Sequence, residues 1–364
     1  MLKNGEVKTL MKKVLVIRKI PKITIHVKRK LLPRASRASR AVKPSRASKT
    51  TGVLGEGPKF ITPPIKWVGG KTQLLGELQE KIPSTIKSYI EPFVGGGSVM
   101  LMMLELCQSG QATIDKVVAA DFNPHVINMY KSIQRDVPQL IKYLTDLKEE
   151  YFSITDLKGN KRPTTLEEGL TSRESYYYWT RTRYNMLTGA SKVSKTTSKV
   201  SKAELAALLI FLNKTGFRGL YREGPNGYNV PYGNYVNPRI FNTSHLTQIS
   251  KLIHDVDFRV ADFRATIAEA TVGDFVYMDP PYVPEKQNSF TEYIRTGFND
   301  QHEDLFNLCT DLKSKEIGFI LSNSHTKLVT DYFADDTFDI LPIDCRRAIN
   351  SKKPDSRTLE VLIT

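Results

Sequence analysis

The sequence predicts an open α/β fold, in which a mostly parallel β-sheet has helices on both faces and carries one long insertion. Short buried strands alternate with helical stretches through residues 59–123 and again through 261–364. Two of these strands end in glycine or proline turns, the position where open α/β sheets bind ligands. The alternation stops between residues 124 and 260, which we therefore assign to an inserted domain.

Each element follows from a local pattern. "SYIEPFVGGG" at 88–97 predicts a strand that enters a glycine turn, and "SVMLMMLELC" predicts the helix after it. "DKVVAADFN" predicts a second strand ending at Asp121, and "GDFVYMDPPY", "IGFILSNS", "FDILPIDC" and "TLEVLIT" predict the later strands. Within the insertion, "VPQLIKYLTDLKEEYF" and "KAELAALLIFLNK" predict helices, and the Gly, Asn and Pro-rich stretch at 215–238 predicts a hairpin-like element.

Residues 1–58 form a basic segment that differs from the rest of the chain. They carry 16 Lys and Arg against Glu6 and Glu56, a net charge of +14 out of the chain's +15. Repeated Arg-Ala-Ser triplets among small and basic residues predict disorder, because this composition cannot bury enough apolar surface. Four roles stay open: an arm that attracts DNA, a nuclear address, a transit peptide and a solubilising extension.

Cysteine and histidine spacing bounds the chemistry. Cys107, Cys309 and Cys345 lie far apart and form no C-x-x-C pair, which argues against a disulfide framework and a zinc site and favours a reducing intracellular compartment. The histidines show no H-x-x-x-H spacing, so we expect no metal. Apolar runs such as "LAALLIFL" fall short of the ~20 residues that span a bilayer, so we expect no membrane partner.

Two glycine motifs precede and follow the first predicted strand. "KWVGGKT" at 66–72 ends like a phosphate-binding P-loop, but Ile65 stands where that motif needs its first glycine. "EPFVGGG" lies between a strand and a helix, and Asp121 ends the next strand. This arrangement suits a ligand at a helix N-terminus whose ribose hydroxyls are held by a carboxylate, although a glycine turn can also be purely structural.

The motif "DPPY" at 279–282 follows the predicted strand "DFVYM". Pro280 and Pro281 stiffen the turn and lack N–H donors, which leaves the Pro280 carbonyl and the Asp279 carboxylate as acceptors beside the ring of Tyr282. Two acceptors match the two hydrogens of an adenine amino group, and a tyrosine can stack on the base. The alternative is an ordinary turn at the end of a strand.

Taken in order, "KWVGGK", "EPFVGGG", Asp121 in "AADFN", "ADF" at 261–263 and "DPPY" resemble the Dam-type (D12 class, α group) DNA adenine-N6 methyltransferases. The resemblance covers about residues 63–364 and includes "GLYREGPNGYNVPYGNY" and "RRAINSKK". It implies a class I methyltransferase (Rossmann-like) doubly wound sheet with an inserted helical and hairpin DNA-recognition domain. It also implies S-adenosylmethionine as cofactor, S-adenosylhomocysteine as product and a GATC-type site in double-stranded DNA as substrate.

The resemblance assigns roles position by position. It places Trp67, Lys71, Phe93, Gly95, Gly96, Gly97, Asp121, Asp262, Phe263 and Asp279 at the cofactor. It places Asp279, Pro280, Pro281 and Tyr282 at the target adenine as catalytic residues. It places Lys66, Phe217, Arg218, Leu220, Arg222, Pro231, Asn234 and Tyr235 at the DNA, with Arg222 reading guanine and Phe217 filling the stack when adenine flips.

Two departures leave the exact recognition sequence open. Arg218 stands where relatives often have asparagine, and Asn234 stands where they often have arginine. RNA adenine methylation and a catalytically silent DNA-binding relative remain as alternatives at this point. We expect a monomer or weak dimer, with a cognate restriction endonuclease as a separately acting partner.

Overall fold

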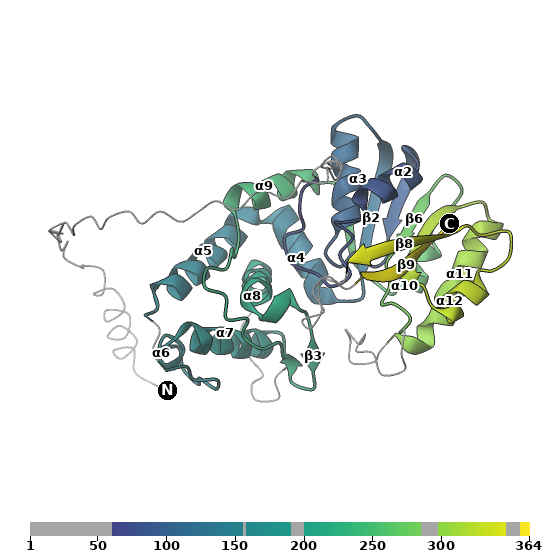
Figure 1. Ribbon diagram of the computed structural model, residues 1–364. Coiled ribbons are helices and arrows are strands. Elements are labelled where there is room, and N and C mark those ends of the chain that lie inside the picture. Colours follow the sequence, from purple (N-terminus) through teal and green to yellow (C-terminus); the bar gives the residue numbers. More distant parts are fainter. Residues whose placement is uncertain (1–59, 156–157, 191–199, 285–297, 347–356) are drawn as a thin grey trace, which may run out of the picture. The chain divides into compact units, whose positions relative to one another are not determined.

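A seven-stranded mixed sheet forms the centre of the computed structural model (Figure 1). The structure describes residues 60–155, 158–190, 200–284, 298–346 and 357–364, which belong to one compact unit, Glu56–Thr364. The predicted basic tail, residues 1–58, lies outside the described residues, as does most of "RRAINSKK". The strands are β1 (Thr85–Glu91), β2 (Thr113–Asp121), β5 (Asp257–Val260), β6 (Phe275–Met278), β7 (Gly318–Ser324), β8 (Ile340–Arg346) and β9 (Arg357–Ile363).

The strand order β5-β2-β1-β6-β7-β9-β8 sets the position of the candidate site. Strands β5, β2, β1, β6 and β7 pair in parallel, and β9 pairs antiparallel with both β7 and β8. The chain runs outward from β1 to β2 on one side, and β6 lies on the other side of β1. Because parallel strands share their carboxyl edge, the segments after β1, β2 and β6 emerge next to one another, at the switch point of the sheet.

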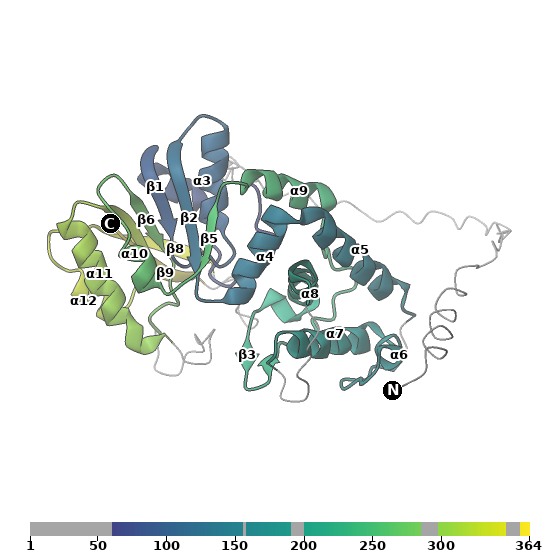
Figure 2. The ribbon, with the colours of Figure 1, turned by 180° about the vertical axis from the view of Figure 1, so that it is seen from behind.

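Helices cover both faces of the sheet, as the sequence predicts (Figures 1 and 2). One face carries α2 (Leu75–Lys81), α3 (Ser98–Gln108) and α4 (Pro124–Arg135), and the other carries α10 (Phe263–Ile267), α11 (His302–Ser314) and α12 (Lys327–Tyr332). The helix α3 begins directly after Gly97, and the Asn123 side chain caps α4 by accepting a hydrogen bond from the His125 N–H group. These starts follow the two turns that the sequence singled out.

The insertion folds around the helix α8, whose sequence is apolar on nearly all sides. Its helices and short strands are α5 (Val137–Ser153), α6 (Leu166–Gly169), α7 (Arg173–Leu187), α8 (Lys202–Thr215), β3 (Glu223–Gly224), β4 (Gly227–Tyr228) and α9 (Thr243–Leu252). The helix α8 packs against α4, α5 and α7, and one continuous apolar cluster runs from α3 to α8. The insertion and the sheet therefore share a hydrophobic core.

The strand β5 differs from the sequence prediction. It lies within residues 124–260, where we expected strand alternation to be absent, yet it pairs with β2 in the central sheet. It has only four residues, and Val260 is 54% exposed at the edge of the sheet. Such a short edge strand gives too little apolar periodicity to be recognised.

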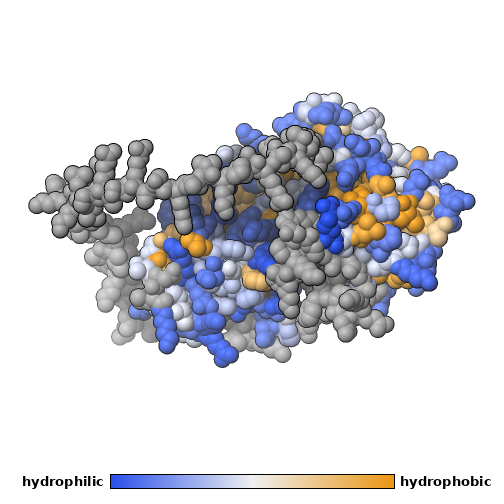
Figure 3. All heavy atoms as spheres, viewed as in Figure 1, coloured by the Kyte–Doolittle hydropathy of each residue, from blue (hydrophilic) through white to orange (hydrophobic). Residues whose placement is uncertain are grey.

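The other edge strand, β8, lies near an apolar area of the surface (Figure 3). Leu341 on β8 and Leu359 on β9 are 37% and 43% exposed. The Arg357 guanidinium pairs with the Asp344 carboxylate at 2.6 Å across the two strands, and charged groups at an edge disfavour pairing with another sheet. Among the described residues, no helix is long and apolar enough to cross a bilayer.

Candidate active site

The glycine turn after β1 has a geometry that requires glycine. Gly95 and Gly97 have φ angles of 43° and 70°, in the left-handed region. A Cβ atom on Gly95 would lie 2.5 Å from Trp67 Nε1, and one on Gly96 would lie 2.9 Å from Trp67 Cβ. The indole of Trp67 therefore packs directly on this turn. The motifs "KWVGGK" and "EPFVGGG", which the resemblance assigns to one cofactor site, are thus in contact.

Asp121, at the end of β2, is tied to the same turn. Its carboxylate accepts hydrogen bonds from the Gly95 N–H group at 2.9 Å and the Asn123 N–H group at 2.8 Å. Burial raises the pKa of Asp121 to about 6, although these two backbone donors oppose the shift. The neighbouring Phe122, which none of the sequence motifs indicated, is 59% exposed beside this carboxylate.

Phe93 and Phe263, both assigned by the resemblance to the cofactor, lie in contact although they follow different strands. Their rings stack with centroids 5.3 Å apart and an interplanar angle of 29°, and Phe298 packs against both. Asp262 caps α10 and accepts from Arg264 Nη1 at 3.1 Å, and the Arg264 guanidinium lies 4.4 Å from the Phe263 ring centroid. Arg264 thus contacts both Asp262 and Phe263, although no sequence motif indicated it.

The "DPPY" turn after β6 holds an ion pair. Lys71 Nζ lies 2.6 Å from Asp279 Oδ1 and also donates to the Gly69 carbonyl at 2.6 Å. The Lys71 side chain is 3% exposed and that of Asp279 is 20% exposed, so water screens the pair poorly. Lys71 Nζ also lies 5.0 Å from the Tyr282 ring centroid, and the Tyr282 hydroxyl donates to Glu360 Oε2 at 2.8 Å. The structure thus joins Lys71 to the predicted catalytic group.

A second acid, Glu91, is the first residue of "EPFVGGG" and is close enough to Asp279 to feel its charge. Glu91 is 2% exposed, and the Tyr89 hydroxyl donates to its carboxyl group at 2.7 Å. Burial raises the pKa of Glu91 to about 8, and repulsion from Asp279 and Asp121 adds to the increase. Burial also raises the pKa of Asp279, but the charge of Lys71 opposes that shift.

The end of β7 holds the "DPPY" turn in place. Asn323 Oδ1 accepts a hydrogen bond from the Val283 N–H group at 3.0 Å, and Ser324 Oγ donates to the Val283 carbonyl at 2.6 Å. Pro280 is buried, whereas Pro281 and Tyr282 are partly exposed. The polar run "SNS" at the end of an apolar strand was the signal that could have identified these supporting residues.

The predicted DNA-binding residues gather on the insertion and on the segment before α2. The Lys66 backbone is bonded to the Asn213 side chain in both directions at 2.8 Å, and Lys66 Nζ lies 5.0 Å from the Tyr235 ring centroid. Tyr235 also accepts a hydrogen bond from the Arg218 N–H group at 2.8 Å. Lys66, Arg218 and Tyr235 are therefore brought together from segments distant in sequence.

Phe217 and Pro231 are adjacent, and Phe217 is 44% exposed instead of buried. The Phe217 N–H group donates to the Pro231 carbonyl at 2.8 Å, and the Arg218 guanidinium lies 5.3 Å from the Phe217 ring centroid. Phe217 could have been an ordinary buried aromatic of the hairpin, but its exposure argues against that interpretation. Arg218 itself has a φ angle of 58°, which arginine adopts rarely.

The two-stranded ribbon β3–β4 carries Arg222 at its base. Arg222 is exposed, and its Nε atom donates to Asn229 Oδ1 at 2.6 Å. Asn234 is exposed with a φ angle of 53°, which asparagine tolerates, and Leu220 is partly buried. The guanidinium of the predicted base reader is thus oriented by a neighbouring side chain on its own ribbon.

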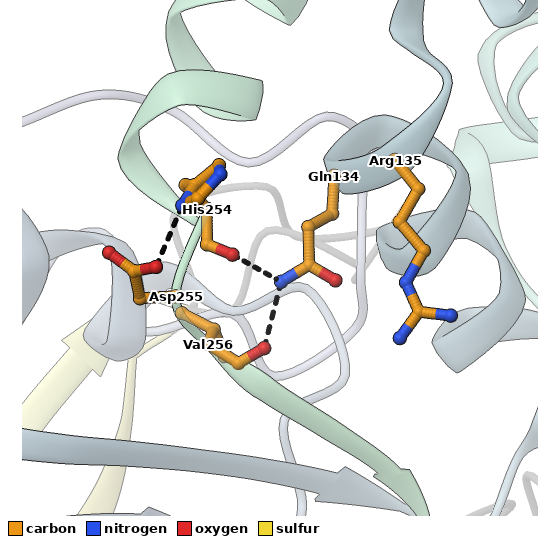
Figure 4. A pocket seen from close by; sticks show the side chains of 5 residues that line it. All are labelled: Gln134, Arg135, His254, Asp255 and Val256. Carbon is orange, nitrogen blue, oxygen red and sulfur yellow. Dashed lines mark hydrogen bonds and ion pairs between the residues drawn. The ribbon is translucent and has the colours of Figure 1, made fainter.

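A surface pocket elsewhere lies between α4 and the start of β5 (Figure 4). Its lining residues are Gln134, Arg135, His254, Asp255 and Val256. The Gln134 amide donates to the carbonyls of Ile253, His254 and Val256 at 2.8–3.0 Å, which anchors the loop before β5. The pocket is at the amino end of β5, whereas Asp262 follows its carboxyl end, so the pocket is not part of the candidate site. Within the described ranges, no group of three His, Cys, Asp or Glu side chains is arranged to hold a metal.

Comparison with known proteins agrees with this geometry. Residues 67–349 match the family described as D12 class N6 adenine-specific DNA methyltransferase. The type II methyltransferase M.MjaIII of Methanocaldococcus jannaschii is 34% identical over 302 residues, covering 80% of this chain and 94% of the relative. The type II methyltransferase M1.LlaDCHI of Lactococcus lactis subsp. cremoris is 32% identical over 315 residues, covering 84% and 95%.

A third relative carries a name that states its reaction. The DNA adenine methylase of Haemophilus influenzae is 27% identical over 299 residues, covering 81% of this chain and 90% of the relative. These matches favour the DNA-directed enzyme over the RNA-directed and catalytically silent alternatives. The chain belongs to the D12 class N6 adenine-specific DNA methyltransferase family and is an adenine-specific DNA methyltransferase with a class I methyltransferase fold.

Proposed function

We propose that this enzyme uses S-adenosylmethionine to methylate the N6 atom of adenine within GATC sites of double-stranded DNA. The observation that carries the proposal is the meeting of two turns at one edge of the sheet. The "DPPY" turn follows β6 and the glycine turn follows β1, and these strands are paired in parallel with Ile90 opposite Val276. A donor bound at one turn and a base bound at the other would lie side by side.

The residues present fit S-adenosylmethionine. At Gly95 to Gly97 the side chains of Trp67 and Tyr130 occupy the space that a Cβ atom would need, so the turn is bare backbone, and Asp121 stands beside it as the proposed acceptor for ribose hydroxyls. Phe93 and Phe263 supply an apolar surface for the adenine ring, next to the Asp262 carboxylate. Bound there, the cofactor would supply an electrophilic methyl group on a positively charged sulfur, and the acidic groups nearby favour a cation.

The chain's own groups prepare the target amine. A neutral adenine amino group is a weak nucleophile, because its lone pair is delocalised into the ring. The Asp279 carboxylate and the Pro280 carbonyl accept its two hydrogens, which localises the lone pair and orients it. The Tyr282 ring stacks on the base, and its hydroxyl bond to Glu360 fixes that ring. Lys71 favours the ionised form of the partly buried Asp279 carboxylate, the form that only accepts hydrogen bonds.

The insertion provides the sequence recognition in this proposal. Arg222, oriented by Asn229, would grip guanine O6 and N7 with two hydrogen bonds, worth on the order of 1–3 kcal/mol of discrimination. The exposed ring of Phe217 would occupy the space that the flipped adenine leaves in the stack. Lys66, Arg218 and Tyr235 would contact the backbone next to the target.

The experiment that tests this proposal is methyl transfer from labelled S-adenosylmethionine to matched duplexes that contain GATC, GATT or no adenine in that context. We expect incorporation into the GATC duplex and protection of GATC sites in plasmid DNA from a methylation-sensitive nuclease. Incorporation without protection would contradict the GATC specificity. Lack of incorporation into any duplex would contradict the choice of donor.

Asp279→Asn tests the assignment of the catalytic residue. Asparagine keeps the size of the side chain but removes the charge that orients the amine, so we expect kcat to fall by at least about a hundredfold with the cofactor still bound. Asp311→Asn, on the exposed surface of α11, is the matched control and should keep normal turnover. Normal turnover by folded Asp279→Asn would rule out the proposed mechanism.

The compartment, the oligomeric state and the partner proteins complete the proposal. Cys107, Cys309 and Cys345 are free thiols, and Cys309 and Cys345 are buried, which suits a reducing compartment. We propose a monomeric or weakly dimeric enzyme that binds duplex DNA by itself, with a restriction endonuclease acting as a separate protein. Analytical ultracentrifugation with and without duplex tests the first point, since a stable dimer would contradict it.

A further inference from the structure

Tyr221 connects the candidate cofactor pocket to the recognition ribbon. The side chain is 4% exposed, and its ring lies 5.5 Å from the Trp67 ring, centroid to centroid. On its other side, the Tyr221 hydroxyl donates to Glu223, the first residue of β3. Tyr221 is thus in contact with the indole that packs on the glycine turn and with the ribbon that carries Arg222.

A second path joins the same two regions. Asp121 binds the Gly95 and Asn123 N–H groups, so it fixes both the glycine turn and the start of α4. The Asn123 side chain lies close enough to the Tyr221 hydroxyl to oppose the rise in its pKa that burial causes, and His125, in the first turn of α4, places its Nε2 atom 3.9 Å from Glu223 Oε1. Both paths therefore converge on Tyr221 and Glu223.

Glu223 fixes the position of Arg222 on the ribbon. It pairs with Tyr228 across β3 and β4, and the next strand residues, Gly224 and Gly227, close the ribbon. Because each of these strands has only two residues, the ribbon has few backbone hydrogen bonds of its own. Side-chain contacts from outside the ribbon therefore help to hold it in place, while Asn229 orients the Arg222 guanidinium.

We propose that Tyr221 and Glu223 are positioning residues that couple occupancy of the cofactor pocket to the placement of the DNA-recognition ribbon, so that cofactor and duplex bind with positive cooperativity. This inference rests on the proposed function, because it takes the glycine turn as the cofactor site and the ribbon as the DNA reader. A ligand that orders the glycine turn orders Trp67 and Asp121, and these hold Tyr221 and Asn123. By linkage, DNA bound to the ribbon strengthens cofactor binding by the same factor.

The test measures the coupling factor in the full-length protein. S-adenosylhomocysteine is the probe, since no methyl transfer follows its binding. Calorimetry gives its affinity with and without a duplex containing one GATC site, and fluorescence anisotropy gives the duplex affinity with and without the probe. In the wild type we expect each ligand to strengthen the other by a factor between roughly 5 and 150, equal in both directions.

Tyr221→Phe removes the hydroxyl bond to Glu223 and keeps the ring against Trp67. Glu223→Gln removes the negative charge that lies next to the Tyr221 hydroxyl and the His125 ring. A hydrogen bond to a charged partner accounts for roughly tenfold in an equilibrium constant, so we expect either variant to remove most of the coupling and bring the coupling factor toward one. The affinity for each ligand alone should change less than about twofold. Tyr232→Phe, which removes the hydroxyl bond to Tyr151 inside the insertion, is the matched control and should keep the coupling.

The outcomes separate the two claims. If the wild type binds neither probe nor duplex, the proposed function fails and this inference fails with it. If both bind but the wild-type factor is one, or if Tyr221→Phe and Glu223→Gln keep the wild-type factor, the inference alone is overturned. If the two residues had a purely structural role, the variants would have lower affinity for each ligand alone and a lower melting temperature, but an unchanged coupling factor. That result would also overturn the inference.

Discussion

Replacing Arg218 by asparagine should stabilise the protein and weaken its binding to DNA. Arg218 has a φ angle of 58°, and its N–H group donates to the Tyr235 hydroxyl at 2.8 Å, so the backbone is held in the left-handed region. This region is unfavourable by about 1–2 kcal/mol for most L-residues, whereas asparagine enters it readily. The turn therefore stores strain at a residue whose charge suits a phosphate.

The magnitude follows from comparing Arg218→Asn with Arg218→Ala. Both variants remove the guanidinium and its contact with the Phe217 ring, but only asparagine relieves the backbone. Asparagine should therefore exceed alanine by about 1 kcal/mol in unfolding free energy, or about 2 °C in melting temperature. Both should lose one phosphate contact, which lowers the slope of log affinity against log salt by about 0.9.

Urea unfolding and anisotropy titrations between 50 and 200 mM salt provide the assay. Over that range the wild type should lose about threefold more affinity than either variant, since one released counterion is missing in the variants. Arg218→Lys keeps the charge and the strain and should resemble the wild type in both measurements. Equal stability of the Asn and Ala variants would refute the strain, and an unchanged salt slope would refute the phosphate contact.

The other predictions concern the charged groups of the site and the tail. Lys71→Met removes the cation that lowers the pKa of Asp279, so the acidic limb of the single-turnover pH profile should move to higher pH. Lys71→Arg should return that limb to its wild-type position. A limb that does not move in Lys71→Met would contradict the effect of Lys71 on Asp279. Glu91 has a folded-state pKa of about 8 against an ordinary 4.5, so the native protein loses stability as pH rises between these values, by at most about 5 kcal/mol. In urea unfolding at pH 5 and pH 8, Glu91→Gln should no longer lose stability as pH rises, whereas the exposed control Glu80→Gln should lose it as the wild type does. The same pH dependence of the unfolding free energy in both variants would argue against a buried protonated Glu91. Deleting residues 1–58, with their net +14, should flatten the fall of DNA affinity with salt, and an unchanged slope would make the tail an address signal or spacer.

The elements that the sequence predicted correctly are those with strong local signals. The helix α8 and the strand β7 contain the apolar runs "LAALLIFL" and "FIL", and the turns after β1 and β6 are marked by glycine and proline. The strand β5 has four residues and is exposed at Val260, so its pairing with β2 decides its conformation more than its own sequence does. Strand pairing is a long-range effect that local periodicity does not contain.

The same limit applies to the candidate site. The motif positions of Asp279 and Asp121 could be predicted because carboxyl ends of parallel strands meet at one edge. The ion pair between Lys71 and Asp279 joins residues 208 positions apart, and no local pattern relates them. The bond from Tyr282 to Glu360 likewise depends on β9 being inserted beside β7, which is the antiparallel departure from a regular parallel sheet.

The partly buried Asp279 and the buried Glu91 favour different protonation states. This difference explains how one site can contain both acids. The charge of Asp279 adds to the effect of burial in raising the pKa of Glu91, and burial together with the charge of Glu360 raises the pKa of Asp279. Lys71 lies on Asp279, not on Glu91, and thereby favours the ionised form of the residue that meets the target amine. Glu91, with a pKa of about 8, holds its proton at neutral pH and adds no second charge. Asp279 can therefore stay a carboxylate, able to accept the amine's hydrogen and to stabilise the positive charge that N6 gains as it is methylated.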